Sequence, residues 1–583
     1  MKEHKILWQY IKPYRFTVLL GIVCILVSML TSLLIPYIVG KAVDDLAEEI
    51  TWKKVLEYSS AVLLASFISG IFLFLQRRLL INASRHIEYD MRQDFFNSLI
   101  YQPMEFFQRN RVGDLMARAT NDLAAVRQIV GPMILYSFQA IFAISVVLPI
   151  LISLSAKLTF LLLLIMPLVS IAVKILGQII HNRFEKVQEK FSEITAMAQE
   201  NLAGVRVIRA FVREESEIKK FEKLNREYAA QNLSLVKYSA AMRPLLFFLI
   251  GLGFVVIVAV GVPMAVRGEI SAGDFTAFIL YLQRMIWYLI AMGYVVNLYQ
   301  RGMASLKRVR QVQEIEPKIK DLPNAITKPR IKGEIEFRNL SFSYNGVKVL
   351  KNINLKIKSG QTVAFVGKTG SGKTTLISLI PRLLETDEDT LFIDGVPVKK
   401  YRLKDLRRAI GFVPQESFLF SDTLAANIAF GIEEENTEKL KEMIEKAADV
   451  ASLTEEIKLF PYGFDQLVGE RGITLSGGQK QRVCIARAII RNPQILILDD
   501  ALSSVDTATE EAILKNLKDF RNGRTTLIVS HRISTVCDAD LICVLRDGEI
   551  VERGTHQELL KLQGEYASLY RRQLLEQEIE AVT

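Results

Sequence analysis

Long apolar segments alternate with long polar ones in the first half of the chain, and this alternation predicts a helical membrane domain. Residues 16–40 contain no charged side chain. As a helix rising about 1.5 Å per residue, they exceed the roughly 30 Å hydrocarbon core of a bilayer. Further apolar segments follow at 58–76, 128–156, 158–180, 244–266 and 275–300. We therefore expect six membrane-spanning helices.

Two polar segments between the expected spans have the composition of helices. Residues 77–127 and 181–243 are rich in Ala, Glu, Lys, Arg, Leu and Gln and poor in Pro and Gly. Folded as hairpins, both would form helical arms, and those of residues 77–127, about 25 residues each, would reach roughly 35 Å beyond the bilayer. We expect the first turn at 106–114 and the second near Gly204 and Phe211. Such arms could pass a force to a docked domain; the alternative is that they only rigidify the bundle.

The second half of the chain has a different pattern. Hydrophobicity falls after Arg301, and a polar, proline-punctuated stretch ends at Gly333, which predicts a linker. Short β-branched and aromatic segments such as 335–342, 362–366 and 410–413 then alternate with helix-like segments, which is typical of a mixed α/β domain with a largely parallel sheet. The expected organisation is a six-span α-helical domain (1–316), a linker (317–333) and an α/β domain (334–583).

Composition and charge agree with a protein that is part membrane-embedded and part soluble. Half of the 583 residues are hydrophobic, yet 23% are charged. Lys2, Lys5, Lys12 and Arg15 precede the first span, whereas Asp44, Asp45, Glu48 and Glu49 follow it. By the positive-inside rule, the N-terminus, both arms and the α/β domain lie in the cytoplasm of a multi-pass protein of the cell membrane.

The net charge of +10 has the same origin, with the anionic bilayer surface as its partner. We expect no nucleic-acid partner, because no basic motif with interleaved aromatic residues is present. The four cysteines, Cys24, Cys484, Cys537 and Cys543, form no CxxC pair and indicate neither a disulfide framework nor a zinc site.

A phosphate-binding loop follows the apolar segment 362–366, because the next residues fit G-x-x-x-x-G-K-[ST]. Small residues let backbone N–H groups approach phosphates, Lys373 supplies positive charge, and Thr374 offers its hydroxyl to magnesium. The pattern predicts nucleotide binding. The expected binding residues are Gly367, Lys368, Thr369, Gly370, Ser371, Gly372, Lys373, Thr374 and Thr375.

A second apolar segment, 495–498, ends in the adjacent carboxylates Asp499 and Asp500. Proteins with this kind of phosphate loop place a carboxylate that helps hold Mg²⁺ at the end of such a strand. A lone aspartate there would usually be an ordinary strand-end residue. Its pairing with the phosphate loop favours Asp499 as a magnesium ligand beside Thr374.

The string Leu475 to Gln479 is identical to the signature of the ATP-binding cassette (ABC) family, which the chain resembles over essentially its whole length. The resemblance implies binding of ATP with Mg²⁺. It also implies that Tyr344 stacks on adenine and that His531 senses the γ-phosphate. Gln415 would join magnesium and the γ-phosphate site to the membrane part, and Asp506 would lie in a loop that crosses between two nucleotide sites.

Six spans followed by one cassette resemble the half-size ABC exporters. That arrangement implies that two chains pair, and that each ATP lies between the phosphate loop of one chain and the signature of the other. This chain's signature residues, Ser476, Gly477, Gly478 and Gln479, would complete the partner's site. Association and dissociation of the cassettes would then pull on the arms and alternate access to a membrane cavity.

Asp500 departs from the family pattern, in which the residue after the magnesium aspartate is a glutamate that polarises the attacking water. Aspartate is shorter by about 1.5 Å, and such misplacement costs around a hundredfold in rate. In this feature the chain resembles one member of the heterodimeric bacterial multidrug exporters, whose other chain carries the glutamate. The alternative is that Asp500 is a tolerated variant in an active homodimer.

The resemblance implies an ATP-hydrolysing translocase that exports hydrophobic or amphipathic compounds, including multiple drugs. Arg284 lies within the sixth apolar segment, where an ionisable group should face a wet cavity or a paired acid, so we expect it to line the transport pathway. A lipid or peptide translocator is the alternative within transport. An ATP-binding regulatory or sensor subunit is the alternative outside it.

Overall fold

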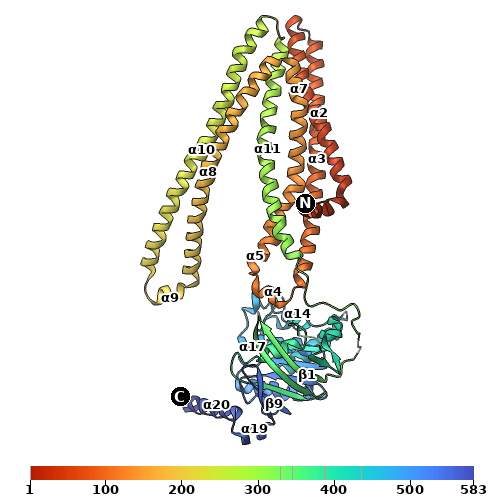
Figure 1. Ribbon diagram of the computed structural model, residues 1–583, viewed down its shortest axis with the longest axis vertical. Helices are drawn as coiled ribbons and strands as arrows, with labels where there is room; N and C mark the ends of the chain where they lie inside the picture. The colour runs from red at the N-terminus through yellow and green to blue at the C-terminus, as the bar shows by residue number, and fades with distance from the viewer. Residues whose placement is uncertain (1, 328–329, 345, 387–388, 435, 583) are drawn as a thin grey trace. The chain divides into compact units, whose positions relative to one another are not determined.

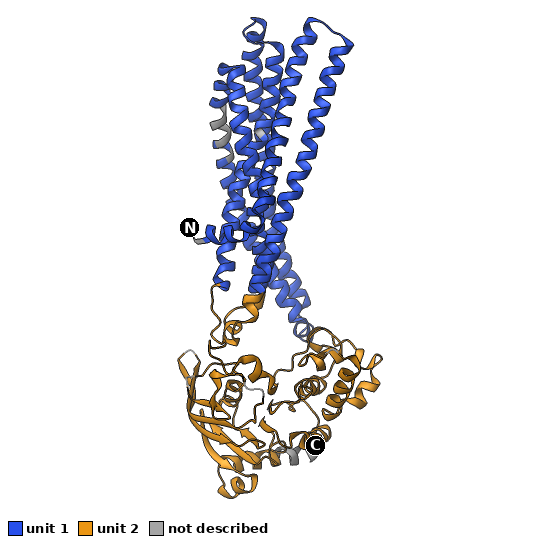
Figure 2. Cartoon of the chain, turned by 90° about the vertical axis from the view of Figure 1, so that its right-hand side faces the viewer, with its two compact units in different colours: residues 1–96, 115–313 blue, residues 97–114, 314–583 orange. Residues whose placement is uncertain are grey.

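A computed structural model describes residues 2–327, 330–344, 346–386, 389–434 and 436–582 of the chain. They form two compact units, Met1–Phe96 with Leu115–Gln313 and Asn97–Asp114 with Glu314–Thr583, which Figure 2 shows in blue and orange. The first unit is helical. The second contains both of the described β-sheets.

The first unit consists mainly of long helices, which Figure 1 labels. In chain order the helices are α1 (Lys2–Ile11), α2 (Arg15–Glu48), α3 (Trp52–Ile100), α5 (Val112–Ala117), α6 (Leu123–Gln128), α7 (Ile134–Leu154), α8 (Ala156–Ala203), α9 (Val205–Ala210), α10 (Glu214–Val266) and α11 (Ala272–Gln313). Two π-helical turns, Arg118–Asp122 and Ile129–Met133, join α5, α6 and α7.

Among the described residues, four helical stretches are long and apolar enough to cross a membrane: Glu3–Glu48, Trp52–Ile100, Val112–Leu154 and Glu214–Val266. The other two expected spans, 158–180 and 275–300, fall in α8 and α11. Both helices include side chains outside the description, at 165–170, 173, 286 and 289–290. The count of six spans therefore stays a prediction.

The third span ends earlier than the apolar pattern indicates. Ser155 is extended, with φ −161°, and its hydroxyl accepts a hydrogen bond from the Leu158 amide at 3.3 Å. It is therefore the N-cap of α8, and the helix before it stops at Leu154. Hydrophobicity alone conceals this turn, because apolar residues continue on both sides of it.

The two predicted helical hairpins are present. Helix α3 continues to Ile100, and the short helix α4 (Met104–Arg109) covers the first part of the expected first turn. Helix α8 ends at Ala203, and Gly204 and α9 form the second turn before α10 begins at Glu214. The N-terminal helix α1 was not expected, because the sequence pattern drew attention only to the apolar run after it.

Helices α2 and α11 approach closely at one end. A Cβ atom at Gly40 would lie 2.8 Å from the carbonyl oxygen of Gly273, and one at Gly273 would collide with the carbonyl of Gly40. The Asp44 carboxylate binds the start of α11 by accepting from the Gly273 amide at 2.7 Å and the Ser271 hydroxyl at 2.6 Å. Farther along, the Tyr281 hydroxyl donates to the Leu33 carbonyl at 2.8 Å.

The second unit contains two β-sheets. An antiparallel sheet has the order β2-β1-β4-β5, and a six-stranded sheet has the order β10-β9-β3-β8-β7-β6, in which only β10 runs antiparallel to its neighbour. The strands are β1 (Ile335–Tyr344), β2 (Val347–Ile357), β3 (Thr362–Val366), β4 (Leu391–Ile393), β5 (Val396–Pro397), β6 (Ile410–Val413), β7 (Ile495–Asp499), β8 (Thr525–Val529), β9 (Leu541–Arg546) and β10 (Glu549–Gly554).

Helices surround the sheets of this unit. They are α12 (Lys373–Leu379), α13 (Leu403–Arg408), α14 (Leu424–Ala429), α15 (Thr437–Val450), α16 (Thr454–Leu459), α17 (Gly477–Ile489), α18 (Thr507–Arg521), α19 (His556–Leu562) and α20 (Glu565–Val582). Alternate side chains of β3 enter two different cores, as the period of a strand requires. Ala364 and Val366 pack on the side of α14, α15 and α17, and Val363 and Phe365 pack with β1 and β2.

The tip of the first hairpin belongs to the second unit. The Gln102 side-chain amide donates to the Ile315 carbonyl at 2.8 Å, and Lys318 pairs with Glu105 at 3.1 Å. The expected domain boundaries at 316 and 334 treat the chain as continuous segments. The first unit ends at Gln313, and residues 97–114 belong to the second unit; the expected domain and linker boundaries stay predictions.

The contact between α2 and α11 generates a stability prediction. We expect Gly273→Ala to lower the melting temperature of the purified full-length protein, because an added methyl group must displace the Gly40 backbone, at a cost of about 1–3 kcal/mol. The matched control is Gly70→Ala in α3, where a Cβ atom would meet nothing within 4 Å. An unchanged melting temperature in Gly273→Ala would contradict the close contact.

Candidate functional site

The strand order of the larger sheet brings the predicted nucleotide-binding residues to one edge of that sheet. Strand β8 lies between β3 and β7, β6 lies beyond β7, and all four run parallel. The carboxyl ends of parallel strands meet at the same edge of a sheet. The phosphate loop follows β3, His531 follows β8, Asp499 ends β7 and Gln415 follows β6, so residues far apart in sequence become neighbours.

A cavity of about 230 Å³ opens at this edge. Of the predicted site residues, its lining includes Thr369, Gly370, Gly372, Lys373, Thr374, Thr375, Gln415, Asp499, Asp500 and His531. Gly367, Lys368 and Ser371 lie in the phosphate loop beside it without lining the cavity. The nucleotide-binding and magnesium-binding groups predicted from the sequence are therefore gathered in one place.

The backbone conformation of the phosphate loop requires glycine at two positions. Gly370 and Gly372 have φ values of +84° and +99°, which side chains with a Cβ rarely adopt. A Cβ atom at Gly372 would also lie 2.7 Å from Leu350. The loop wraps around the Lys373 ammonium group, which donates to the carbonyls of Gly367 at 2.8 Å and Lys368 at 2.9 Å.

Lys373 is a cation prepared for an anionic ligand. Lys373 is 5% exposed, and this burial lowers the pKa of its ammonium group, while the nearby Asp500 and Asp499 carboxylates oppose the shift. Helix α12 begins at Lys373, so its unpaired N-terminal amides lie at the same place. Backbone amides and a buried cation together suit a phosphate group.

Asp499 and Thr374 fit a magnesium ion. The Thr374 hydroxyl donates to the Asp499 carboxylate at 3.1 Å, so two hard oxygen groups are adjacent. Asp499 is 1% exposed, and burial is the main cause that raises the pKa of its carboxyl group to about 6. A divalent cation would restore the charged carboxylate, and the exposed Gln415 on the same cavity could add its amide oxygen.

Asp500 has an unusual backbone conformation. Its φ is +49°, in the left-handed region that aspartate tolerates better than most residues. Its amide donates to the Val529 carbonyl at 2.9 Å, which fixes it beside the end of β8. Across the cavity, burial and the Lys373 charge lower the pKa of His531, while Asp500 opposes that shift. We therefore expect a largely neutral imidazole at neutral pH.

Tyr344 and the signature are not brought to this cavity. Tyr344 ends β1, its ring meets Phe342 edge-on at 4.9 Å, and it lines a separate cavity with Glu105 and Lys318. Of the signature, Ser476, Gly477, Gly478 and Gln479 are all absent from the described lining of the phosphate cavity. The expected adenine and signature contacts therefore stay predictions.

The signature forms the N-terminus of α17. The Ser476 hydroxyl accepts from the Gln479 amide at 3.2 Å, and the Gln479 side chain accepts from the Ser476 amide at 2.9 Å. This reciprocal capping box leaves Gly477 and Gly478, which have no side chains, at the helix start. The resulting surface of small residues and backbone amides suits an anion brought by another molecule.

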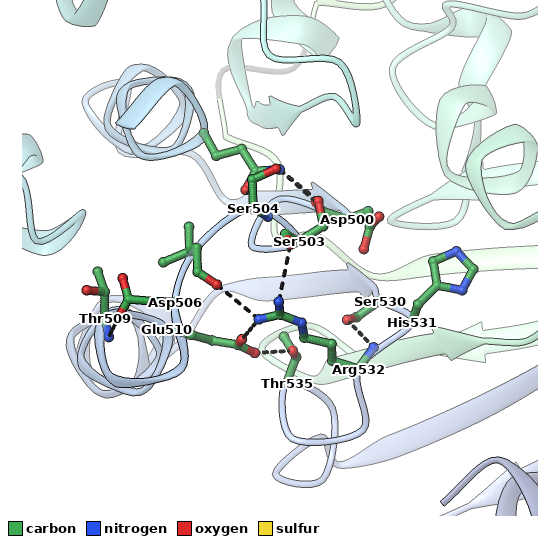
Figure 3. A network of polar contacts seen from close by, with 12 residues as sticks. Asp500, Ser503, Ser504, Asp506, Thr509, Glu510, Ser530, His531, Arg532 and Thr535 are labelled. Atoms are coloured by element: carbon green, nitrogen blue, oxygen red, sulfur yellow. Dashed lines mark hydrogen bonds and ion pairs between the residues drawn. The ribbon is translucent and has the colours of Figure 1, made fainter. Parts of the chain in front are cut away.

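Sequence reasoning missed a polar network behind the cavity, part of which Figure 3 shows. It joins Glu510 and Arg532 to the loop after Asp500, and Gln481 of α17 reaches the same loop through Ser503 at 2.8 Å and Ser504 at 2.9 Å. Asp506, expected to lie in a loop between two sites, caps α18 by accepting from the Thr509 amide at 2.9 Å. The one sequence signal for Arg532 is its position next to His531.

In the helical unit, Arg284 of α11 donates to the Ser32 hydroxyl of α2. The guanidinium group therefore has a polar partner on a neighbouring helix. This contact satisfies one of its donors and neither supports nor opposes a transport role.

Known protein families match both the helical half and the α/β half of the chain. The family model described as ABC transporter transmembrane region matches residues 18–289, and the one described as ABC transporter matches residues 350–503. A probable multidrug resistance ABC transporter ATP-binding/permease protein, YheI of Bacillus subtilis, is 36% identical over 97% of both chains. An ATP-dependent lipid A-core flippase of Syntrophus aciditrophicus is 34% identical, covering 99% of this chain and 96% of the relative.

The fold has a solved counterpart. The structure of a bacterial Atm1-family ABC exporter with ATP bound matches with a TM-score of 0.77 and 26% identity, over 96% of this chain and 99% of that one. The sequence relatives and this structure extend over both units, so the similarity is not confined to the nucleotide-binding half. The chain belongs to the ABC transporter family, as a half-transporter of the exporter type.

Proposed function

We propose that this protein is one subunit of a pump that uses ATP to export hydrophobic or amphipathic compounds, including several drugs, across the cell membrane. The observation that carries the proposal is the cavity in which the phosphate loop, Asp499 and His531 meet, on a chain that also has helices of membrane-spanning length. The charge bias of the loops favours a cytoplasmic N-terminus and ATP-binding unit.

The location of the signature supports a paired assembly. The phosphate cavity lacks signature residues among its described lining, and the capped start of α17 is a surface prepared for an anion. We propose that a second half-transporter supplies the missing signature and receives this one. Each ATP would then hold two chains together, and its preference for the closed pair would drive the conformational change.

Within the site, each residue has a distinct task. The phosphate loop and Lys373 hold the phosphates, Thr374, Asp499 and Gln415 hold the metal, and His531 contacts the γ-phosphate. Magnesium, when bound, would neutralise charge on the phosphates. Asp500 is proposed to accept a hydrogen bond from the attacking water, but its carboxylate is one methylene shorter than that of glutamate, so its alignment is poorer.

We therefore propose that this chain's own site binds ATP and hydrolyses it slowly, and that the partner chain carries the competent carboxylate. The alternative is that Asp500 is a tolerated substitution in an active homodimer; aspartate is one of the residues that accept the left-handed backbone found at this position. The two possibilities differ in the activity of the isolated chain and can be separated by experiment.

Lipid translocation is a second candidate, favoured by the relative named as a lipid A-core flippase. The relatives named as multidrug resistance proteins favour drug export. Reconstituted vesicles distinguish the two: ATP-dependent accumulation of a dye supports the drug pump, and ATP-dependent movement of a fluorescent lipid supports the flippase. Nucleotide binding without flux of either would favour a regulatory subunit.

The buried cation generates a prediction on binding. We expect Lys373→Ala to raise the Kd of the full-length protein for ATP by about ten- to a hundredfold, because a charge-assisted hydrogen bond contributes about 1.5–3 kcal/mol. The measurement is displacement of a fluorescent nucleotide. Lys518→Ala, an exposed lysine on α18, is the matched control and should bind normally. Equal affinity in both variants would exclude the cavity as the ATP site.

Asp500 generates a prediction on turnover. In the chain purified alone, where a second copy of the chain would supply the signature, we expect Asp500→Glu to raise ATPase activity up to about a hundredfold, because the longer side chain can align the water. Asp500→Ala should change the low basal rate little. Robust activity in the wild-type chain alone that disappears in Asp500→Ala would instead show that Asp500 is competent and that no glutamate-bearing partner is needed.

The role of Arg284 is tested by transport. We expect Arg284→Ala to alter ATP-dependent dye accumulation in vesicles for at least one substrate, because a cation is removed from the proposed pathway. Ser32→Ala removes the hydrogen-bond partner but keeps the charge, and should transport normally if the charge is what matters. Unchanged transport of every substrate in Arg284→Ala would remove this residue from the pathway.

A further inference from the structure

The loop that carries His531 is held from two sides. It follows β8 and consists of Ser530, His531, Arg532 and Ile533, which belong to no strand or helix. In Figure 3 the Arg532 side chain turns toward Glu510, while His531 points away from it. The position of the imidazole therefore depends on how the backbone of this short loop is fixed.

Arg532 fixes the loop from one side. Its guanidinium group pairs with Glu510, which is 2% exposed and also accepts from the Thr535 hydroxyl. The same group donates to the carbonyls of Val505 at 3.1 Å and Ser503 at 3.2 Å. A buried carboxylate with two donors is costly to disturb, so this side of the loop is strongly constrained.

Gln573 of the C-terminal helix α20 fixes the loop from the other side. Its side-chain oxygen accepts from the Ile533 amide at 2.8 Å, and its side-chain nitrogen donates to the His531 carbonyl. One amide group therefore bridges the residues before and after Arg532. Because the His531 carbonyl and the Ile533 amide are both engaged, rotation of the backbone between them is restricted, and with it the direction of the His531 side chain.

Helix α20 is itself firmly attached. The Glu552 carboxylate of β10 accepts from the Tyr566 amide at 3.1 Å and also from the Glu565 amide, both at the start of α20. Tyr566 is fully buried and meets His556 of α19 at 2.7 Å. Gln573 lies about two helical turns beyond this anchor. The helix therefore presents its amide to the loop from a defined place.

From these contacts we propose that Gln573 is a positioning residue for His531, so that the C-terminal helix sets how well this chain's own site distinguishes ATP from ADP. The inference rests on the proposed function, because it takes His531 as the group that contacts the γ-phosphate. ADP lacks that phosphate, so a displaced imidazole weakens ATP binding and leaves ADP binding unchanged. A merely structural role for Gln573 would weaken both nucleotides together.

The test is nucleotide binding by the full-length protein, with any partner that co-purifies with it. The non-hydrolysable analogue AMP-PNP and ADP each displace a fluorescent nucleotide, and the ratio of their Kd values measures recognition of the γ-phosphate. We expect His531→Ala to reduce the preference for AMP-PNP by about tenfold or more, as for loss of one charge-assisted hydrogen bond. Gln573→Ala should cause a loss of similar size with an unchanged Kd for ADP.

Two further variants and a control make the outcome decisive. Gln573→Ala should add nothing in the His531→Ala background, because residues that act through one another are not additive. Gln573→Glu keeps the size of the side chain and the acceptor for Ile533 but loses the donor to His531, so it should also lose the preference. Arg571→Ala, an exposed position in the same helix, should bind both nucleotides normally.

Failure of this inference differs from failure of the proposed function. If His531→Ala lowers the preference and neither Gln573 variant does, or if the Gln573 variants weaken both nucleotides equally, the positioning role is overturned and the role of His531 stands. If His531→Ala itself leaves the preference unchanged, the γ-phosphate role of His531 is wrong and the inference is overturned with it.

Discussion

The parallel pairing of β3, β8 and β7 is the constraint on which the nucleotide-binding unit depends. It brings together the ends of three strands that lie at least 30 residues apart in the chain, at Val366, Asp499 and Val529. Each strand is buried; β7 ends in Asp499 itself, and a polar residue or loop directly follows each of the three strands. The phosphate loop, the two carboxylates and His531 are therefore neighbours because the sheet is parallel, and any slip in strand register would separate them.

Burial then gives these groups their electrostatic character. Lys373 and Asp499 are both almost fully buried. Burial lowers the pKa of the Lys373 ammonium group and raises the pKa of the Asp499 carboxyl group, so in each case it favours the neutral form. Separately, the ammonium and the carboxylate are costly to keep charged; a phosphate beside Lys373 and a divalent cation beside Asp499 would stabilise both charged forms at once. The charged forms of Lys373 and Asp499 are thus least stable in the empty site and most stable when nucleotide and metal are bound together. An ATP-driven machine requires this coupling between nucleotide binding and metal binding.

Local patterns made much of this predictable from the sequence, and long-range pairing accounts for what was missed. The phosphate loop, Asp499 and the strands at 362–366 and 410–413 are contiguous signals, and the two helical arms follow from composition alone. The break at Ser155 is a single N-cap within apolar sequence, so hydrophobicity could not reveal it. The contacts of Arg532 with Glu510 and of Gln573 with His531 join residues 22 and 42 positions apart through no recognisable spacing. Such partners follow only from the fold.

The loop from Asp500 to Asp506 connects the phosphate cavity with the backbone beside the signature. Its first residue lines this chain's cavity, and a Cβ atom at Gly478 of the signature would lie 2.8 Å from the Ser504 carbonyl. The contacts that hold the loop at residue 500 use the main chain: the carbonyl of Asp500 accepts from the Ser503 hydroxyl at 3.0 Å and from the Gln481 side chain at 3.4 Å. The carboxylate of Asp500 takes no part in either bond. A shorter side chain at this position can therefore change the chemistry of the chain's own site without loosening the loop beneath its signature. The contacts that hold the loop are therefore independent of the Asp500 carboxylate, so the proposed slow hydrolysis at this cavity is compatible with an ordered signature at the start of α17.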